Sequence, residues 1–131
     1  MFVLGVDPGL SRCGYGCVEQ RGRTQRAVAA GVITTPPSMA LPERLATLQR
    51  EFRALLADLQ PTEVAIERVF FQVNVRTAMP VAHAVGVLMA ESVTAGCPVT
   101  EYTPNEVKEA VAGWGAAPKH QVEQMVQTIL G

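Results

Sequence analysis

Two acidic residues each end a short apolar segment, a pattern typical of a site for a divalent cation. Asp7 follows the run Phe2–Val6, and Glu67 follows three apolar residues. A carboxylate at the end of a buried strand is costly to desolvate unless a cation or a hydrogen-bond donor meets it. A turn is predicted directly after Asp7, so this residue could instead cap the turn through backbone amides.

A pair of carboxylates favours a hard cation. Mg²⁺ prefers carboxylate oxygens and keeps several waters, and two such ions about 4 Å apart could stabilise the attacking and leaving oxygens of a phosphodiester. There is no His-x-x-x-His and no Cys/His cluster, so zinc is disfavoured. His83 and His120 lack ligand spacing and are predicted on helix surfaces. Spacing alone leaves two alternatives open: a metal-dependent nuclease site, or plain caps and surface acids.

Hydrophobic periodicity and turn residues predict the elements that position these acids. Val3, Leu4 and Val6 suit a strand buried on both faces. A fourth strand, joined to the first sheet through a helix, should lie parallel by a right-handed crossover, which would place Asp7 and Glu67 at one end of the sheet. The other predicted elements are strands at 14–20 and 27–34 around a turn at 21–24, a helix at 41–59, strands at 64–67 and 99–102, and a helix at 77–95.

Beyond these elements the chain contains a loop at 68–76 and two further helices. A capping box at 103–106 begins one helix, and Pro118 opens the last. In the helix at 77–95 the small residues Ala82, Gly86 and Ala90 recur every four positions. This small-residue face is compatible with a symmetric helix-to-helix dimer, and equally with internal packing against the sheet.

Composition limits the class of protein. The 131 residues suit one compact domain, and 48% hydrophobic against 18% charged residues indicate a globular chain. Three cysteines without a C-x-x-C pair argue for a reducing cytoplasm. We expect neither a membrane span nor a signal peptide, because Asp7 interrupts the first apolar run early. With a net charge of -1, any phosphate-binding surface must be a focused patch.

Three ordered segments resemble the RuvC family of bacterial crossover-junction endodeoxyribonucleases. Gly5–Gly16 looks like the family's N-terminal signature, and Ala65–Phe70 with Asn74 resembles its second. The third match is Val107–Gly113 followed by Gly115, Lys119, Gln121 and Val122. The similarity covers essentially all 131 residues in order.

The resemblance implies an α/β, ribonuclease H-like fold, with a mixed five-stranded sheet flanked by helices in a single domain over 1–131. It implies a homodimer that resolves Holliday junctions by symmetric, Mg²⁺-dependent nicking in DNA recombination and repair. Two ions per active site are expected, with Mn²⁺ able to substitute. It also implies four-way junction DNA and a branch-migration helicase complex as partners in the cytoplasm.

The same resemblance assigns roles to individual residues. By motif position Asp7 and Glu67 would be metal ligands, and Lys108 and Lys119 would meet the phosphates beside the scissile bond. Phe70 would stack on an unpaired base near the exchange point, a contact that contributes about 1–3 kcal/mol. The further candidates for contact with DNA are Asn74, Arg76, Ser11 and Arg12.

One departure from the family pattern bears on activity. The family carries two more acidic ligands in a C-terminal helix, and no such segment follows Leu130-Gly131. We therefore expect weak Mg²⁺ binding and little cleavage by the chain as printed. A non-catalytic, dimeric junction-binding domain is the alternative. Asp-x-Gly followed by Ser also opens the phosphate loop of actin-like sugar kinases, but those need a second loop and domain.

Overall fold

The structure is a computed structural model that describes residues 1–68 and 75–103. Five strands form one mixed sheet in the order β3-β2-β1-β4-β5. The strands are β1 (Phe2–Asp7), β2 (Arg12–Arg21), β3 (Thr24–Thr34), β4 (Glu63–Glu67) and β5 (Val99–Tyr102). β1 pairs antiparallel with β2 and parallel with β4, which confirms the predicted parallel pairing of the first and fourth strands.

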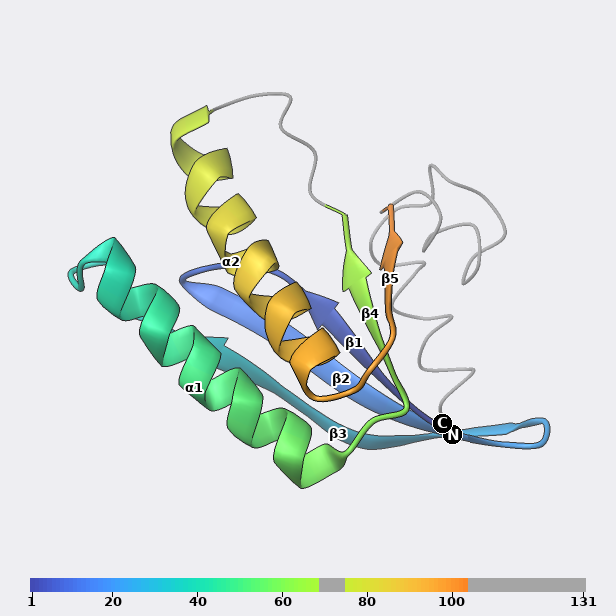
Figure 1. Cartoon of the computed structure of the whole chain (residues 1–131). Coiled ribbons are helices and arrows are strands. Elements are labelled where there is room, and N and C mark those ends of the chain that lie inside the picture. Colours follow the sequence, from blue (N-terminus) through green and yellow to red (C-terminus); the bar gives the residue numbers. More distant parts are fainter. Residues whose placement is uncertain (69–74, 104–131) are drawn as a thin grey trace.

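Helices α1 (Leu41–Leu59) and α2 (Val75–Thr94) lie over the same face of the sheet (Figure 1). Their apolar residues meet the alternate residues of the strands that point toward them. The resulting core contains Leu4, Val6, Cys13, Cys17, Ile33, Val64 and Ile66 from the sheet, with Leu48, Phe52, Leu56, Ala84 and Leu88 from the helices. No helix among the described residues is long and apolar enough to cross a membrane.

Element bounds differ from the sequence predictions at the hairpin and at α2. β2 begins at Arg12 and β3 at Thr24, so the turn contains only Gly22 and Arg23, and Gly22 adopts a φ of 59°. The ends of this ribbon are exposed and polar, so the apolar alternation that marks a strand is missing there. α2 begins at Val75, which moves Arg76 from the predicted loop into the first helical turn.

An ion pair between the exposed Arg53 and the buried Glu91 joins α1 to α2. Arg53 donates to both carboxylate oxygens of Glu91 at 3.0 and 2.7 Å, and Gln49 donates to Glu91 Oε1 at 2.8 Å. These hydrogen bonds lower the pKa of Glu91, which therefore stays ionised although its side chain is buried. The relative placement of the two helices thus rests on a polar clamp as well as on the apolar core.

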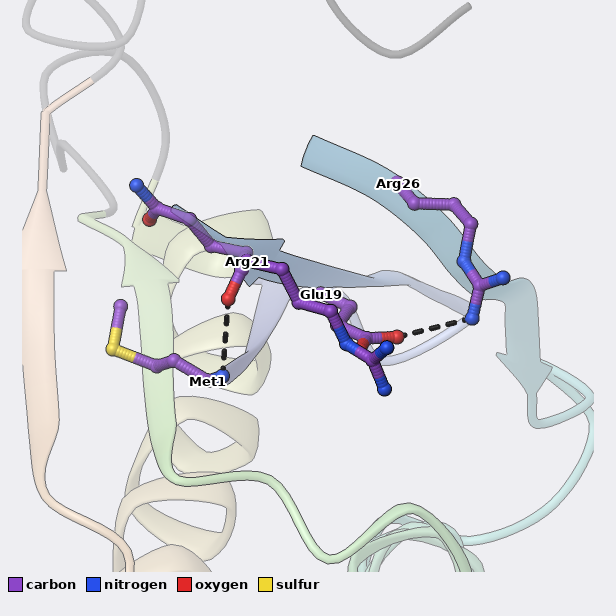
Figure 2. A network of polar contacts seen from close by, with 5 residues as sticks. Met1, Glu19, Arg21 and Arg26 are labelled. Carbon is purple, nitrogen blue, oxygen red and sulfur yellow. Dashed lines mark hydrogen bonds and ion pairs between the residues drawn. The ribbon is translucent and has the colours of Figure 1, made fainter. Parts of the chain in front are cut away.

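A second polar network lies at the β2–β3 hairpin end of the sheet. Figure 2 shows Arg26 reaching the carboxylate of Glu19, with Nη2 3.0 Å from Oε2. Arg21 pairs with the other oxygen of Glu19, and the amino group of Met1 donates to the Gln20 carbonyl at 3.2 Å. Burial of Glu19 opposes its ionisation, but the two arginines outweigh it and lower its pKa.

Candidate active site

Asp7 is the last residue of β1 and projects from the sheet face opposite the helices. Leu4 and Val6 are buried on the helix side, so alternation places Gly5 and Asp7 on the other face. Asp7 itself is exposed and lies opposite Gly14 of β2. The predicted burial of β1 on both faces is complete only for residues on the helix side, because Val3 and Gly5 on the other face are half-buried.

Glu67 ends the neighbouring parallel strand in the same way. Val6 pairs with Ile66, and each acid is the next residue along its own strand. The parallel register and the period of two therefore bring both carboxylates to one edge and one face of the sheet. The predicted juxtaposition of Asp7 and Glu67 is confirmed.

Both acids line a hollow of about 520 Å³ on that face. Its floor is made of small residues, because β1, β2 and β4 contribute Gly5, Gly14, Gly16 and Ala65, and Tyr102 of β5 lies at its side. Side chains this small leave space above the sheet. The position agrees with the general rule that open α/β sheets bind ligands at the carboxyl ends of parallel strands.

The turn after Asp7 depends on Gly9. A Cβ atom at position 9 would lie 2.2 Å from the carbonyl oxygen of Arg12, closer than any side chain can approach. Asp7 does not cap this turn, since within residues 1–68 and 75–103 no group donates a hydrogen bond to its carboxylate. The structure therefore gives the turn-cap alternative no support.

The donor set at this edge fits a hard cation. Two carboxylates supply oxygen ligands, and the described residues contain no cluster of three or more His, Cys, Asp and Glu side chains. Cys13 lies near Asp7, but burial, together with the Asp7 charge, raises the pKa of its thiol to about 11 despite a hydrogen bond from the Gly9 backbone. Cys13 belongs to the core on the helix side of the sheet, whereas its neighbour Gly14 lies opposite Asp7, so the thiol points away from the face that carries the carboxylates.

A second hollow, of about 450 Å³, lies on the other side of the β1–β2 turn. Residues 9–12, Arg44, Arg76, Pro80 and Val81 line it, and we call it the arginine groove. It brings the predicted DNA contacts Ser11, Arg12 and Arg76 together. In Figure 1 the β1–β2 turn and the first turns of α1 and α2 lie at the same end of the molecule.

Arg44 belongs to this groove and was missed by the sequence reasoning. Its place on the polar side of α1 resembles that of any solvated helix residue, and no local pattern singles it out. Only the packing of α1 beside the β1–β2 turn reveals its role. Of the other predicted site residues, Phe70, Asn74, Lys108 and Lys119 lie outside the described residues, whereas His83 is exposed on α2 as expected.

Comparison with known proteins identifies the family. The family model described as crossover junction endodeoxyribonuclease RuvC matches residues 3–131. The chain belongs to the RuvC family. A RuvC from Alkaliphilus oremlandii is 45% identical over 130 residues, covering 99% of this chain and 79% of the relative. One from Moorella thermoacetica is 47% identical over 131 residues, covering 100% and 78%.

Solved structures of RuvC proteins support the same family and fold. The structure of Thermus thermophilus RuvC in complex with a Holliday junction substrate matches with a TM-score of 0.93 and 36% identity, covering 100% of this chain and 80% of that one. The yeast mitochondrial resolvase Ydc2 matches with a TM-score of 0.69 at 16% identity, which shows the fold alone. The predicted ribonuclease H-like fold is confirmed, and membership of the RuvC family leaves the sugar-kinase alternative without support.

Proposed function

We propose that this protein is a structure-selective endonuclease that resolves Holliday junctions by symmetric nicking during DNA recombination and repair. The observation that carries the proposal is the placement of Asp7 and Glu67 on adjacent parallel strands of a RuvC-family chain. The name of the T. thermophilus relative supports four-way junction DNA as the substrate.

The two carboxylates are proposed as ligands of Mg²⁺, with Mn²⁺ able to substitute and two ions in the complete site. When bound, such an ion polarises the phosphodiester and offsets the charge that develops as the strand is cut. Asp7 and Glu67 supply the oxygen ligands that this ion prefers. The hydrogen bonds between the parallel strands β1 and β4 hold the two strand ends side by side. The reaction is hydrolysis, in which water bonds to phosphorus as the bond to the leaving oxygen breaks.

The remaining residue assignments are proposals that rest on family resemblance. Lys108 and Lys119 would neutralise phosphates beside the scissile bond, and Phe70 would stack on an unpaired base at the exchange point. Asn74 would contact the strand near Phe70. The expectation of weak Mg²⁺ binding and little cleavage by the chain as printed stays a prediction. This chain covers 76–80% of the length of four RuvC relatives that are 44–47% identical to it.

A homodimer is part of the proposal, and the small-residue face of α2 is its candidate interface. Gly86 and Ala90 are exposed, and a Cβ atom at position 86 would meet nothing within 4 Å. Residues on another side of α2, such as Ala84 and Leu88, pack into the core instead. Ala82, the third residue of this face, is half-buried, so the exposed part at Gly86 and Ala90 is where a second helix could approach closely. A cytoplasmic branch-migration helicase is the further partner proposed.

Asp7→Asn tests the metal-ligand assignment. In the full-length gene product we expect cleavage of a four-way junction with Mg²⁺ to fall by at least about 100-fold, because a neutral amide holds the cation poorly. Binding of the junction without a divalent cation should persist. Asp58→Asn, which neutralises an exposed acid on α1, is the matched control and should cleave normally. Equal cleavage by the two variants would contradict the assignment.

The same assay separates the non-catalytic alternative. If the full-length gene product binds junctions but does not cleave them at any Mg²⁺ or Mn²⁺ concentration, the protein is a binding domain. Preference for a four-way junction over linear duplex is expected in both cases. Absence of that preference would overturn the substrate assignment itself.

A further inference from the structure

Arg44 is held by three hydrogen bonds that tie α1 to the β1–β2 turn and to the end of β3. Its Nε donates to Thr35 Oγ1 at 3.1 Å. Its Nη2 donates to Ser11 Oγ at 2.8 Å and to the Thr35 carbonyl at 3.3 Å. Thr35, the residue after β3, is itself held in place. It is buried, and its hydroxyl donates a hydrogen bond to the Leu10 carbonyl at 2.5 Å.

These contacts orient the guanidinium without neutralising it. A guanidinium has five N–H donors, and the three bonds use the one on Nε and the two on Nη2. The two N–H groups on Nη1 remain for a ligand. All three acceptors are hydroxyl or carbonyl oxygens, so the positive charge of Arg44 has no carboxylate partner in this network.

The groove around Arg44 concentrates positive charge. Arg12 and Arg76 line it with Arg44, and none of its lining residues is acidic. This concentration matters because the chain as a whole carries a net charge of -1. The groove lies across the β1–β2 turn from the hollow that holds Asp7 and Glu67, so a strand that crosses the turn could reach both.

We propose that the arginine groove binds a backbone phosphate of the DNA strand that passes the carboxylate pair, with Arg44 as its fixed cation. Arginine suits this role because its planar donor edge matches phosphate geometry, and its orientation here is set before the ligand arrives. The inference rests on the proposed function, because a DNA substrate supplies the phosphate. It adds a phosphate contact, on the helix side of the turn, that is separate from the cation site.

The test is the salt dependence of junction binding without a divalent cation. Each phosphate contact contributes about 0.9 to the slope of log K against log salt. Arg44→Gln should therefore lower the slope by about 0.9 and weaken binding roughly eightfold at 0.1 M salt. Arg50→Gln is the matched control, because it removes the same charge from an exposed position of the same helix outside the groove.

A second pair of variants separates charge from the shape of the turn. Thr35→Val removes two of the hydrogen bonds around Leu10 and Arg44 but keeps all three arginines, so the slope should stay at the wild-type value. Arg44→Lys keeps the charge and should restore the slope that Arg44→Gln loses. If Thr35→Val lowers the slope as much as Arg44→Gln does, the effect comes from the turn and the proposal is wrong.

Failure of the groove proposal can be distinguished from failure of the proposed function. If the wild-type chain shows no preference for a junction over linear duplex, the proposed function fails. If the wild type binds junctions and Arg44→Gln matches Arg50→Gln in both affinity and slope, only the groove proposal is overturned.

Discussion

Arginine side chains gather at both ends of β2, and the two clusters differ in what the guanidinium groups contact. At the hairpin end Arg21 and Arg26 pair with the buried carboxylate of Glu19 (Figure 2). At the other end Arg44 bonds only neutral oxygens, beside Arg12 and Arg76. In the first network the two exposed guanidinium groups pair with a buried carboxylate, whereas in the second the guanidinium is oriented by neutral oxygens and its charge remains available to an anion.

This difference shows that arginine content alone does not identify a phosphate-binding surface. The sequence places four arginines within residues 1–26, yet two of them serve Glu19. The groove instead combines arginines from three separate elements, which are far apart in the sequence. The acceptor that each guanidinium meets decides whether it acts in folding or can act in binding.

Distorting the β1–β2 turn, which separates the groove from the carboxylate hollow, should reduce cleavage more than any substitution within the two arginine clusters. Gly9→Ala places a methyl group against the Arg12 carbonyl, 2.2 Å away, so the turn must move. Because misplacement by about 1 Å can cost 100-fold in rate, we expect cleavage to fall by about that factor. The melting temperature should fall too, since overpacking costs about 1–3 kcal/mol.

Arg50→Ala is the stability control for that variant. Arg50 is exposed on α1, and alanine is the strongest helix former, so the melting temperature should not fall. Unchanged cleavage by Gly9→Ala would show that the turn tolerates displacement. It would also show that cleavage does not depend on the relative placement of the groove and the carboxylates.

The stability that the hairpin network contributes should fall at acid pH, whereas the contribution of the groove network should not change. The arginines lower the pKa of Glu19 below its ordinary value of 4.5, although burial opposes this. Its stabilisation is therefore fully present above about pH 4.5 and is lost as the pH falls through the lowered folded-state pKa. Glu19→Gln should lower the melting temperature at pH 7 and flatten its fall at acid pH.

Thermal melts between pH 3 and pH 7 compare the hairpin network with the groove network directly. The groove network contains no carboxylate, so any destabilisation by Arg44→Gln should be the same at both ends of that range. An acid dependence of the Arg44→Gln difference, or its absence for Glu19→Gln, would contradict the contrast between the two clusters.

The smallest change in melting temperature is expected for Arg26→Gln. It removes one of two partners of Glu19, leaving Arg21 in place, so the melting temperature should fall slightly at pH 7. The salt slope of junction binding should keep its wild-type value, because this charge is engaged within the protein. A loss of slope comparable to that of Arg44→Gln would assign the hairpin to the DNA surface as well.

Local patterns predicted the elements that carry the carboxylate pair. Short apolar runs ending in an acid predicted the two strands, and the bounds of α1 at 41–59 match the prediction. Which face each strand buries is seen only in the structure, from Leu4 and Val6 on β1 and Val64 and Ile66 on β4. The right-handed crossover then leaves one parallel arrangement for β1 and β4. The placement of Asp7 beside Glu67 follows from these rules because strand period and crossover handedness act locally and generally.

The partners of individual polar side chains were decided only by tertiary structure. Arg44 meets Ser11 across 33 positions of sequence, and Arg53 meets Glu91 across 38. Such pairs depend on how a helix docks on the sheet, which is set by core packing rather than by the residues around either partner. The sequence by itself thus determined the fold and the acid pair, and the tertiary structure decided which arginines pair with a carboxylate and which can meet DNA.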